Sequence, residues 1–183
     1  MGLSIHYRGQ IKDMSLVPKL IGELKEISSM LQWDNDVFDD EIAKGISLLP
    51  ADSEPVIVAF TPDGKLCSPY LLYHNIQPAF WISVKTQFAG IEVHKAVIRL
   101  LKYVNTNYFS DFELHDEGGY WETDDEKVLE KQFKTYDLAM DMLSTALTGF
   151  KYEPHEPVER LALRLEEFLK KKLETRSADR REN

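Results

Sequence analysis

The segment Phe112–Thr123, FELHDEGGYWET, concentrates the residue types that most often take part in chemistry. It holds one histidine, four carboxylates, a Gly-Gly pair and a Tyr-Trp pair within a dozen residues. Phe112 and Leu114 alternate with polar neighbours as in a half-buried strand. Asp116-Glu117-Gly118-Gly119 then interrupts the pattern, and Tyr120-Trp121-Glu122 resumes it. Such a segment can hold a cation, receive a basic partner or lie in solvent, and no catalytic spacing in it decides among the three.

Asp116, Glu117 and Glu122 are the candidate metal ligands in this segment. Carboxylate oxygens suit Mg²⁺ or Ca²⁺, and the adjacent His115 would extend the choice to Mn²⁺ or Zn²⁺. A divalent cation is therefore the one cofactor that the sequence suggests. The alternative is structural, because Asp-Glu-Gly-Gly is also an ordinary β-turn. Glu122 precedes a predicted helix, whose dipole favours a negative charge there.

A second candidate site lies at a predicted strand–loop–helix transition, KTQFAG. The free N–H groups of a helix start attract anions, and neighbouring polar side chains can add contacts. The segment is not a phosphate-binding P-loop, because G-x-x-x-x-G-K-[ST] is absent. A lysine and a glycine near a helix start are also common without any ligand. The candidate ligand-binding residues here are Lys85, Thr86, Gln87 and Gly90.

His94 is the candidate general base, since it lies close to the buried stripe of a predicted helix and within reach of Asp116 or Glu122 if that helix packs on the FELHDE strand. The competing interpretation is a histidine at the edge of the core with an ordinary hydrogen bond. Cys67 has no histidine beside it in the sequence and behaves as a small apolar residue. No G-x-S-x-G nucleophile motif occurs.

The elements that would position these residues follow from hydrophobic spacing. Strand and helix patterns alternate as β–α–β–β–β–β–α–β–α–α, which predicts an α+β fold with a mostly antiparallel sheet, helices packed on one face and a C-terminal helix. Thr123 and Glu126 form a capping-box pattern at one helix start. Thr61-Pro62-Asp63-Gly64 predicts a hairpin turn. The predicted helices span 15–31, 91–107, 124–147 and a last stretch after Pro157, whereas Trp33–Glu41 is expected to be an acidic loop.

The domain organisation predicted from this pattern has three parts. Residues 1–148 form the α+β domain, 149–176 a linker and the C-terminal helix, and 177–183 a disordered tail. The net charge of −9 argues against a nucleic-acid or anionic-membrane partner. The single cysteine, Cys67, and the lack of a signal-peptide pattern favour a cytoplasmic, soluble protein. A protein partner or a small anionic ligand is compatible with this composition.

Two segments, KTQFAGIEVH and FELHDEGGYWETDDE, together with the opening SIHYRGQIKD, resemble a family of uncharacterised bacterial proteins that share K-T-Q-F-A-G…H and D-E-G-G-Y-W-E-T segments. The resemblance covers about Leu3 to Leu147. It implies no activity and therefore no catalytic role. The matching positions are Lys85, Gln87, Gly90, His94, Asp116, Glu117, Gly118, Gly119, Trp121 and Glu122.

Two functions are compatible with the sequence. The first is a non-enzymatic binding domain in which Tyr120, Trp121 and Trp81 anchor a protein or peptide, since aromatic residues are enriched at binding hot spots. The alternative is a metal-assisted phosphoester hydrolase or nucleotide-binding protein that uses the carboxylate cluster and His94. A third interpretation is that both polar segments are purely structural.

Overall fold

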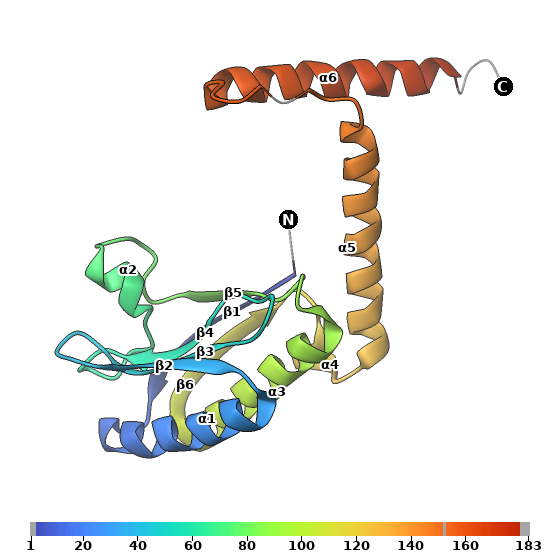
Figure 1. Ribbon diagram of the computed structural model, residues 1–183. Coiled ribbons are helices and arrows are strands. Elements are labelled where there is room, and N and C mark those ends of the chain that lie inside the picture. Colours follow the sequence, from blue (N-terminus) through green and yellow to red (C-terminus); the bar gives the residue numbers. More distant parts are fainter. Residues whose placement is uncertain (1–2, 152, 180–183) are drawn as a thin grey trace. The chain divides into compact units, whose positions relative to one another are not determined.

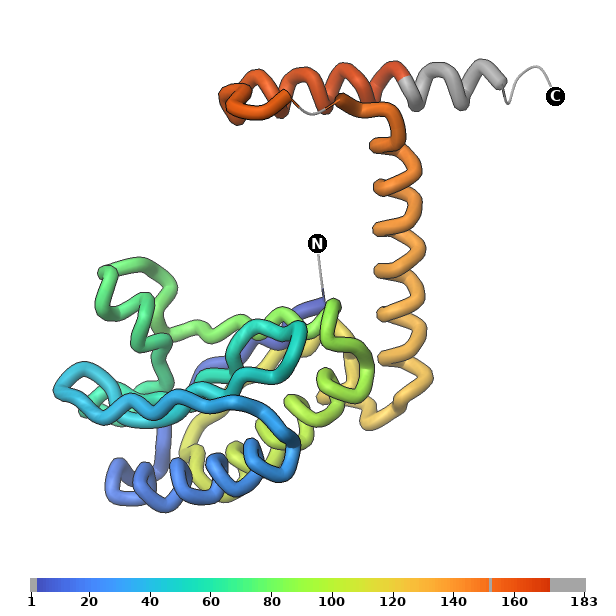
Figure 2. Tube along the Cα trace, viewed as in Figure 1, coloured from blue at the N-terminus to red at the C-terminus, as the bar shows by residue number. Residues whose placement is uncertain are grey.

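The computed structural model describes residues 3–151 and 153–179, with side chains described as far as Lys171. The chain divides into two compact units, Met1–Lys134 and Thr135–Asn183. Figures 1 and 2 follow the chain from blue to red through both units. The predicted α+β class is confirmed, with antiparallel pairing throughout the described strands and a C-terminal helix.

The first sheet carries both segments that the sequence singled out. It pairs β5 (Ile82–Lys85), β1 (Ser4–Ile11) and β6 (Phe109–Asp116) in that order, all antiparallel. Because β1 is central, the end of β5 and the end of β6 lie on either side of its first residues. Ile5 is paired with Asp116 on one side and with Val84 on the other.

The second sheet pairs β2 (Asp34–Asp39), β3 (Lys44–Leu49) and β4 (Val56–Phe60). The prediction of an acidic loop over 33–41 is therefore wrong for most of its length. Aspartate disfavours strands, but β2 pairs with β3 along its whole length and this pairing outweighs the local preference. As an edge strand, β2 stays exposed at every residue except the half-buried Phe38.

Two long helices cover one side of the strands (Figure 1). α1 (Val17–Leu31), preceded by the 3₁₀ turn η1 (Met14–Leu16), packs on β2 and β3, and α3 (Gly90–Tyr108) packs on β6. The two helices are joined by Glu23, which accepts hydrogen bonds from the hydroxyls of Tyr103 and Tyr108. Both helix predictions are confirmed to within about two residues.

The predicted hairpin after β4 is only partly correct. Lys65 O accepts a hydrogen bond from Thr61 N at 3.0 Å, and Gly64 has the positive φ of +83° that the turn requires. The second arm meets β4 at a bridge between Phe60 and Leu66 and then leaves the sheet. The chain continues as a short helix, α2 (Pro69–Tyr73), which begins at a proline as helix starts often do and lies on the opposite side of the strands from α1 (Figure 1).

The segment after β6 is helical where a resumed strand was predicted. Tyr120–Thr123 forms the single turn α4, and α5 runs over Glu126–Leu147. The capping-box prediction is displaced by two residues, because the carboxylate of Asp125 accepts from Lys127 N at 2.9 Å. The Thr123 hydroxyl instead accepts from Asp125 N at 3.2 Å.

The C-terminal unit contains the later part of α5 and α6 (Val158–Asp179). The boundary between these two units falls inside α5. Three residues of the predicted disordered tail, 177–179, belong to α6, and 180–183 lie outside the described residues. None of the helices described is long and apolar enough to cross a membrane.

Candidate functional site

His94 is the point at which the KTQFAG and FELHDEGGYWET segments meet. Its side chain projects from the first turns of α3 and is 0% exposed. Nδ1 lies 2.7 Å from the hydroxyl of Thr86, at the end of β5, and Nε2 lies 3.0 Å from Oδ1 of Asp116, at the end of β6. Since the carboxylate can only accept, we place a proton on Nε2. The hydroxyl of Thr86 lies between Nδ1 and the carbonyl oxygen of Leu3, which is 3.4 Å from it.

Asp116 is held by backbone as well as by His94. Its Oδ1 accepts from Gly118 N at 2.7 Å, and its Oδ2 accepts from Tyr120 N at 2.8 Å and Trp121 N at 3.0 Å. A short side chain that accepts from the next few N–H groups stabilises a turn and the helix start that follows it. Asp116 therefore fixes the path of the chain from β6 into α4.

The electrostatics of Asp116 follow from these contacts. Burial alone would raise the pKa of its carboxyl, since a charge loses hydration there. The contact with His94 and the N–H groups of Trp121 and Gly118 outweigh burial and hold the pKa of Asp116 below its usual range. His94 Nε2 and Asp116 Oδ1 lie close together, but their geometry is not that of a hydrogen bond.

Gly118 leaves the space that His94 occupies. A Cβ built on Gly118 would lie 2.6 Å from Cδ1 of Leu129 and 2.8 Å from Nε2 of His94. Leu129 is itself 0% exposed, so neither neighbour has open space to move into. The first glycine of the Gly-Gly pair serves close packing, and the second, Gly119, adopts the positive φ of +70° at the start of α4.

The three predicted metal ligands do not converge. Asp116 points into the core, whereas Glu117, the next residue, accepts from Ser4 N at 2.8 Å and lies 3.8 Å from Nε2 of His6. Glu122 is exposed on α4. Within the part of the chain that the structure describes, no three His, Cys, Asp or Glu side chains are grouped so as to hold a metal ion.

The residues of the predicted anion site have separate roles. The Lys85 backbone is bound by Glu54, with Lys85 N donating to Oε2 at 2.8 Å and Glu54 N donating to Lys85 O at 3.0 Å. Thr86 is the buried partner of His94. Gln87 is 9% exposed and its Oε1 has no hydrogen-bond partner, while Gly90 begins α3 with a φ of +84° and open space around it.

The predicted aromatic anchors differ in accessibility. Tyr120 is 4% exposed, and its hydroxyl accepts from Arg99 Nη2 at 3.4 Å. Trp121 is half-buried against Phe112, with ring centroids 5.9 Å apart. Trp81 lies under the guanidinium of Arg8, whose Cζ is 5.0 Å from the ring centroid. Tyr120 is thus a core residue, and the two tryptophans offer only part of their surface.

The arrangement of Thr86, His94 and Asp116 has the residue types of a hydroxyl–imidazole–carboxylate triad but not its accessibility. The side chains of His94 and Asp116 are 0% exposed, and Thr86 is 0% exposed as a residue. A reacting group must come within hydrogen-bond distance of a general base. Since the three groups are sealed in the core, what they do in this structure is join β5, α3 and β6.

Sequence reasoning missed the surface around α2. Large apolar side chains are exposed there. Residues 65–72 were predicted to be the second arm of the hairpin and 79–86 a strand, whereas Pro69–Tyr73 is helical. The signal was the run from Pro69 to Phe80, in which aromatic residues stand between prolines without the alternation of a strand. The exposed members are Tyr70 at 64%, Tyr73 at 49%, Ile76 at 45% and Phe80 at 40%.

Comparison of the chain with family models, with curated proteins and with solved structures gave no match.

Proposed function

We propose that the N-terminal unit is a non-enzymatic binding domain that receives a protein partner on the surface of α2 and the residues that follow it. This surface, the α2 surface, is defined by Tyr70, Tyr73, Ile76 and Phe80. The observation that carries the proposal is the exposure of all four large apolar side chains in one short segment. Contiguous apolar exposure marks interaction sites in soluble proteins. Tyr70 and Tyr73 lie on one short helix, and Ile76 and Phe80 follow within seven residues of its end.

The acidic hairpin beside the α2 surface supports a basic partner. The hydroxyl of Tyr73 donates to Asp40, which also accepts from Ile42 N and Ala43 N, so the hairpin turn is fixed against the aromatic helix. β2 and its turn carry Asp34, Asp36, Asp39, Asp40 and Glu41. Lys44 pairs with Asp39 at 2.9 Å, which leaves the segment strongly negative. Negative potential next to an apolar patch favours positively charged partners.

The metal-assisted alternative draws less support. Both oxygens of Asp116 accept backbone N–H groups, and Glu117 lies on the other face of the sheet. His94, the candidate general base, is buried, with Nδ1 2.7 Å from the hydroxyl of Thr86 and Nε2 3.0 Å from Oδ1 of Asp116. These positions account for the polar residues by structural contacts. Exposed apolar residues on and just after α2 therefore give better support for a binding site.

The experiment is affinity capture with the full chain as bait, followed by identification of the retained proteins. Tyr70→Ser and Phe80→Ser should each lower retention of a specific partner at least tenfold, because exposed aromatic anchors supply much of the binding energy at an interface. Raising the salt concentration should weaken retention as well, since screening reduces attraction to the hairpin carboxylates.

Met30→Ser is the matched control. Met30 is 84% exposed on α1 and lies outside the α2 surface. Its replacement by serine therefore removes exposed apolar area without changing the α2 surface. Partners that are retained equally by the parent chain, by Tyr70→Ser and by Met30→Ser would show that the α2 surface is not the binding site.

A further inference from the structure

One side of α5 carries a row of apolar residues that the proposed function does not use. These residues recur at alternating steps of four and three, which is the spacing of a helix that packs lengthwise against another helix. We call this row the α5 seam. It consists of Leu129, Phe133, Tyr136, Met140, Leu143 and Leu147.

The two halves of the α5 seam have different surroundings. Leu129 is 0% exposed and Phe133 is 6% exposed, and both belong to the core of the N-terminal unit. Met140 and Leu143 are 40% and 45% exposed, and none of the described side chains of residues 135–147 is buried. Most helices in proteins owe their stability to packing of such an apolar face, so the second half of the seam calls for a partner. We call this second half the outer half; it consists of Tyr136, Met140, Leu143 and Leu147.

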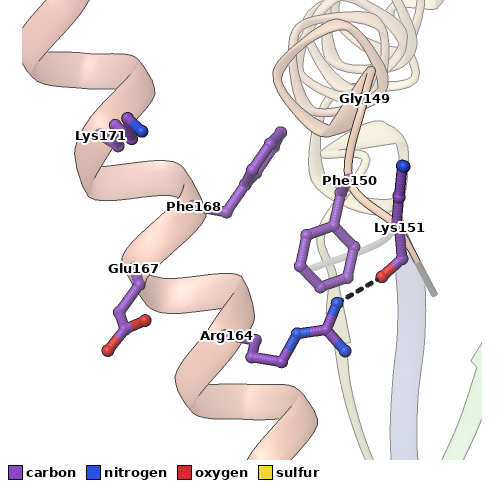
Figure 3. A pocket seen from close by; sticks show the side chains of 7 residues that line it. All are labelled: Gly149, Phe150, Lys151, Arg164, Glu167, Phe168 and Lys171. Carbon is purple, nitrogen blue, oxygen red and sulfur yellow. Dashed lines mark hydrogen bonds between the residues drawn. The ribbon is translucent and has the colours of Figure 1, made fainter. Parts of the chain in front are cut away.

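The helix α6 is already occupied by the connector that precedes it. The ring of Phe150 meets that of Phe168 edge to face, with centroids 5.3 Å apart, and Cζ of Arg164 lies 5.5 Å from the Phe150 centroid. Figure 3 shows these side chains, together with the hydrogen bond of 2.7 Å from Arg164 Nη2 to the carbonyl of Lys151. To cover the α5 seam with the same side, α6 would have to give up these contacts.

We propose that the outer half of the α5 seam binds the same segment of a second copy of this chain, as an antiparallel pair of helices. Met140 of each copy packs against Leu143 of the other, and Tyr136 packs against Leu147. Each layer of the pair therefore joins two apolar side chains. The two-fold axis of such a dimer lets one patch serve as both surfaces of the interface.

The residues that flank the α5 seam favour this register. It places Asp137 of one copy beside Ser144 of the other, and Ala139 beside Ala146, so that no like charges meet and small side chains lie between the helices. A shift by one heptad toward the N-terminal unit would bring the two Asp137 side chains together, and like charges in an interface are costly. The flanks are thus complementary to a second copy in one register.

The burial of Leu129 and Phe133 favours the antiparallel direction. At these residues the seam side of α5 is covered by the N-terminal unit. A parallel second copy would bring its own N-terminal unit to the same side of the same turns, and two folded units cannot share that space. An antiparallel copy brings only the end of its α5 to this point.

The test is sedimentation equilibrium of the full chain. Because the interface has few layers, we expect a reversible dimer with a dissociation constant of about 1–100 µM, measured at chain concentrations up to about 300 µM. A chain that stays monomeric over this range would overturn the proposal. A dimer supports it if the substitutions below place the interface on the α5 seam.

Leu143→Ser should weaken dimerisation at least about tenfold, since symmetry places the substitution in two layers and each loses buried apolar area. Leu138→Ser is the matched control, because Leu138 lies on the same helix, outside the seam, and is 61% exposed. It should leave the dissociation constant unchanged, and both variants should keep the helix content of the parent chain by circular dichroism. Equal weakening in the two variants, or an unchanged dissociation constant in Leu143→Ser, would overturn the proposal.

Substitutions at Ser144 test the register. Ser144→Lys should strengthen dimerisation about two- to tenfold and Ser144→Asp should weaken it by a similar factor, because two exposed pairs with Asp137 are gained or two repulsions are added. Met142→Lys changes the net charge by the same amount as Ser144→Lys, at a position that is 58% exposed and outside the seam, and should have no effect. Equal effects of Ser144→Lys and Met142→Lys would overturn the antiparallel register. None of these results bears on the α2 surface, which belongs to the other unit.

Discussion

Two acidic segments of this chain have similar composition, but the structure places their carboxylates in different surroundings. The segment after β6 directs Asp116 into the core, where its oxygens accept from Gly118, Tyr120 and Trp121 N–H groups and face His94. The segment around β2 keeps its aspartates on an exposed sheet edge. The difference shows that a carboxylate becomes structural when the backbone beside it turns its N–H groups inward. A carboxylate on a regular strand stays available to solvent or to a partner.

Removal of the Asp116 carboxylate should cause the largest loss in the free energy of unfolding. Asp116→Ala leaves three N–H groups of the turn without their acceptor and removes the carboxylate that His94 faces. Each unsatisfied buried donor costs about 1–3 kcal/mol, so we expect a loss of about 3 kcal/mol or more. Urea denaturation should show a loss of this size in the free energy of unfolding. Asp34→Ala, on the exposed edge of β2, should change it by less than about 0.5 kcal/mol. Similar losses in both variants would remove the distinction between the segments.

Gly118→Ala should give the next largest effect. The added methyl group would lie 2.6 Å from Leu129 Cδ1 and 2.8 Å from His94 Nε2, and overpacking of this kind costs about 1–3 kcal/mol. Gly22→Ala is the control, because nothing lies within 4 Å of its Cβ position in the middle of α1. Replacement of a mid-helix glycine by alanine should stabilise the protein by about 0.5–1 kcal/mol. Two thermal melts with shifts of opposite sign would confirm the expectation, and a neutral Gly118→Ala would show that the turn can move.

The pH dependence of stability should report the depressed pKa of Asp116. In the unfolded chain the carboxyl titrates near pH ~3.9, whereas in the folded protein it stays ionised to lower pH. Its stabilising effect is therefore complete above the unfolded pKa and is lost as pH falls through the folded pKa. The difference in free energy of unfolding between the parent chain and Asp116→Asn should shrink as pH is lowered from ~5 toward ~2.

Other carboxylates with depressed pKa values change stability in the same direction. They are present in both proteins, so their contributions cancel in that difference. A difference that stays constant across this pH range would show that the ionised form of Asp116 is not the stabilising one. The other groups are Asp13, Glu23, Asp40, Asp63, Glu126 and Glu166.

The fold class and the long helices were predictable because the apolar stripes of α1 and α3 repeat at helical spacing over many residues. β2 was not predictable in the same way, since its aspartates disfavour strands and only pairing with β3 makes it one. The position of the site in the chain could be predicted from the sequence, but the burial of its side chains could not. The histidine, the carboxylate and the glycines indicate a junction between strands and helices. The sequence gives no measure of side-chain burial, and burial is what distinguishes a structural triad from a catalytic one.

Glu122→Gln should produce the smallest change in stability. It also tests directly whether the segment after β6 binds a metal ion. Glu122 is exposed on α4, so its neutralisation should change stability by less than about 0.5 kcal/mol. A metal ion bound only to the folded state at 100 times its dissociation constant would add about 2.7 kcal/mol, which a thermal melt detects readily. We expect Mg²⁺, Mn²⁺, Ca²⁺ and Zn²⁺ to shift the melting temperature of the parent chain and of Glu122→Gln equally. Asp36→Asn, at the β2 edge, controls for nonspecific loss of negative charge. A shift abolished by Glu122→Gln and retained by Asp36→Asn would make the segment after β6 a metal site, and its buried aspartate would then belong to that site.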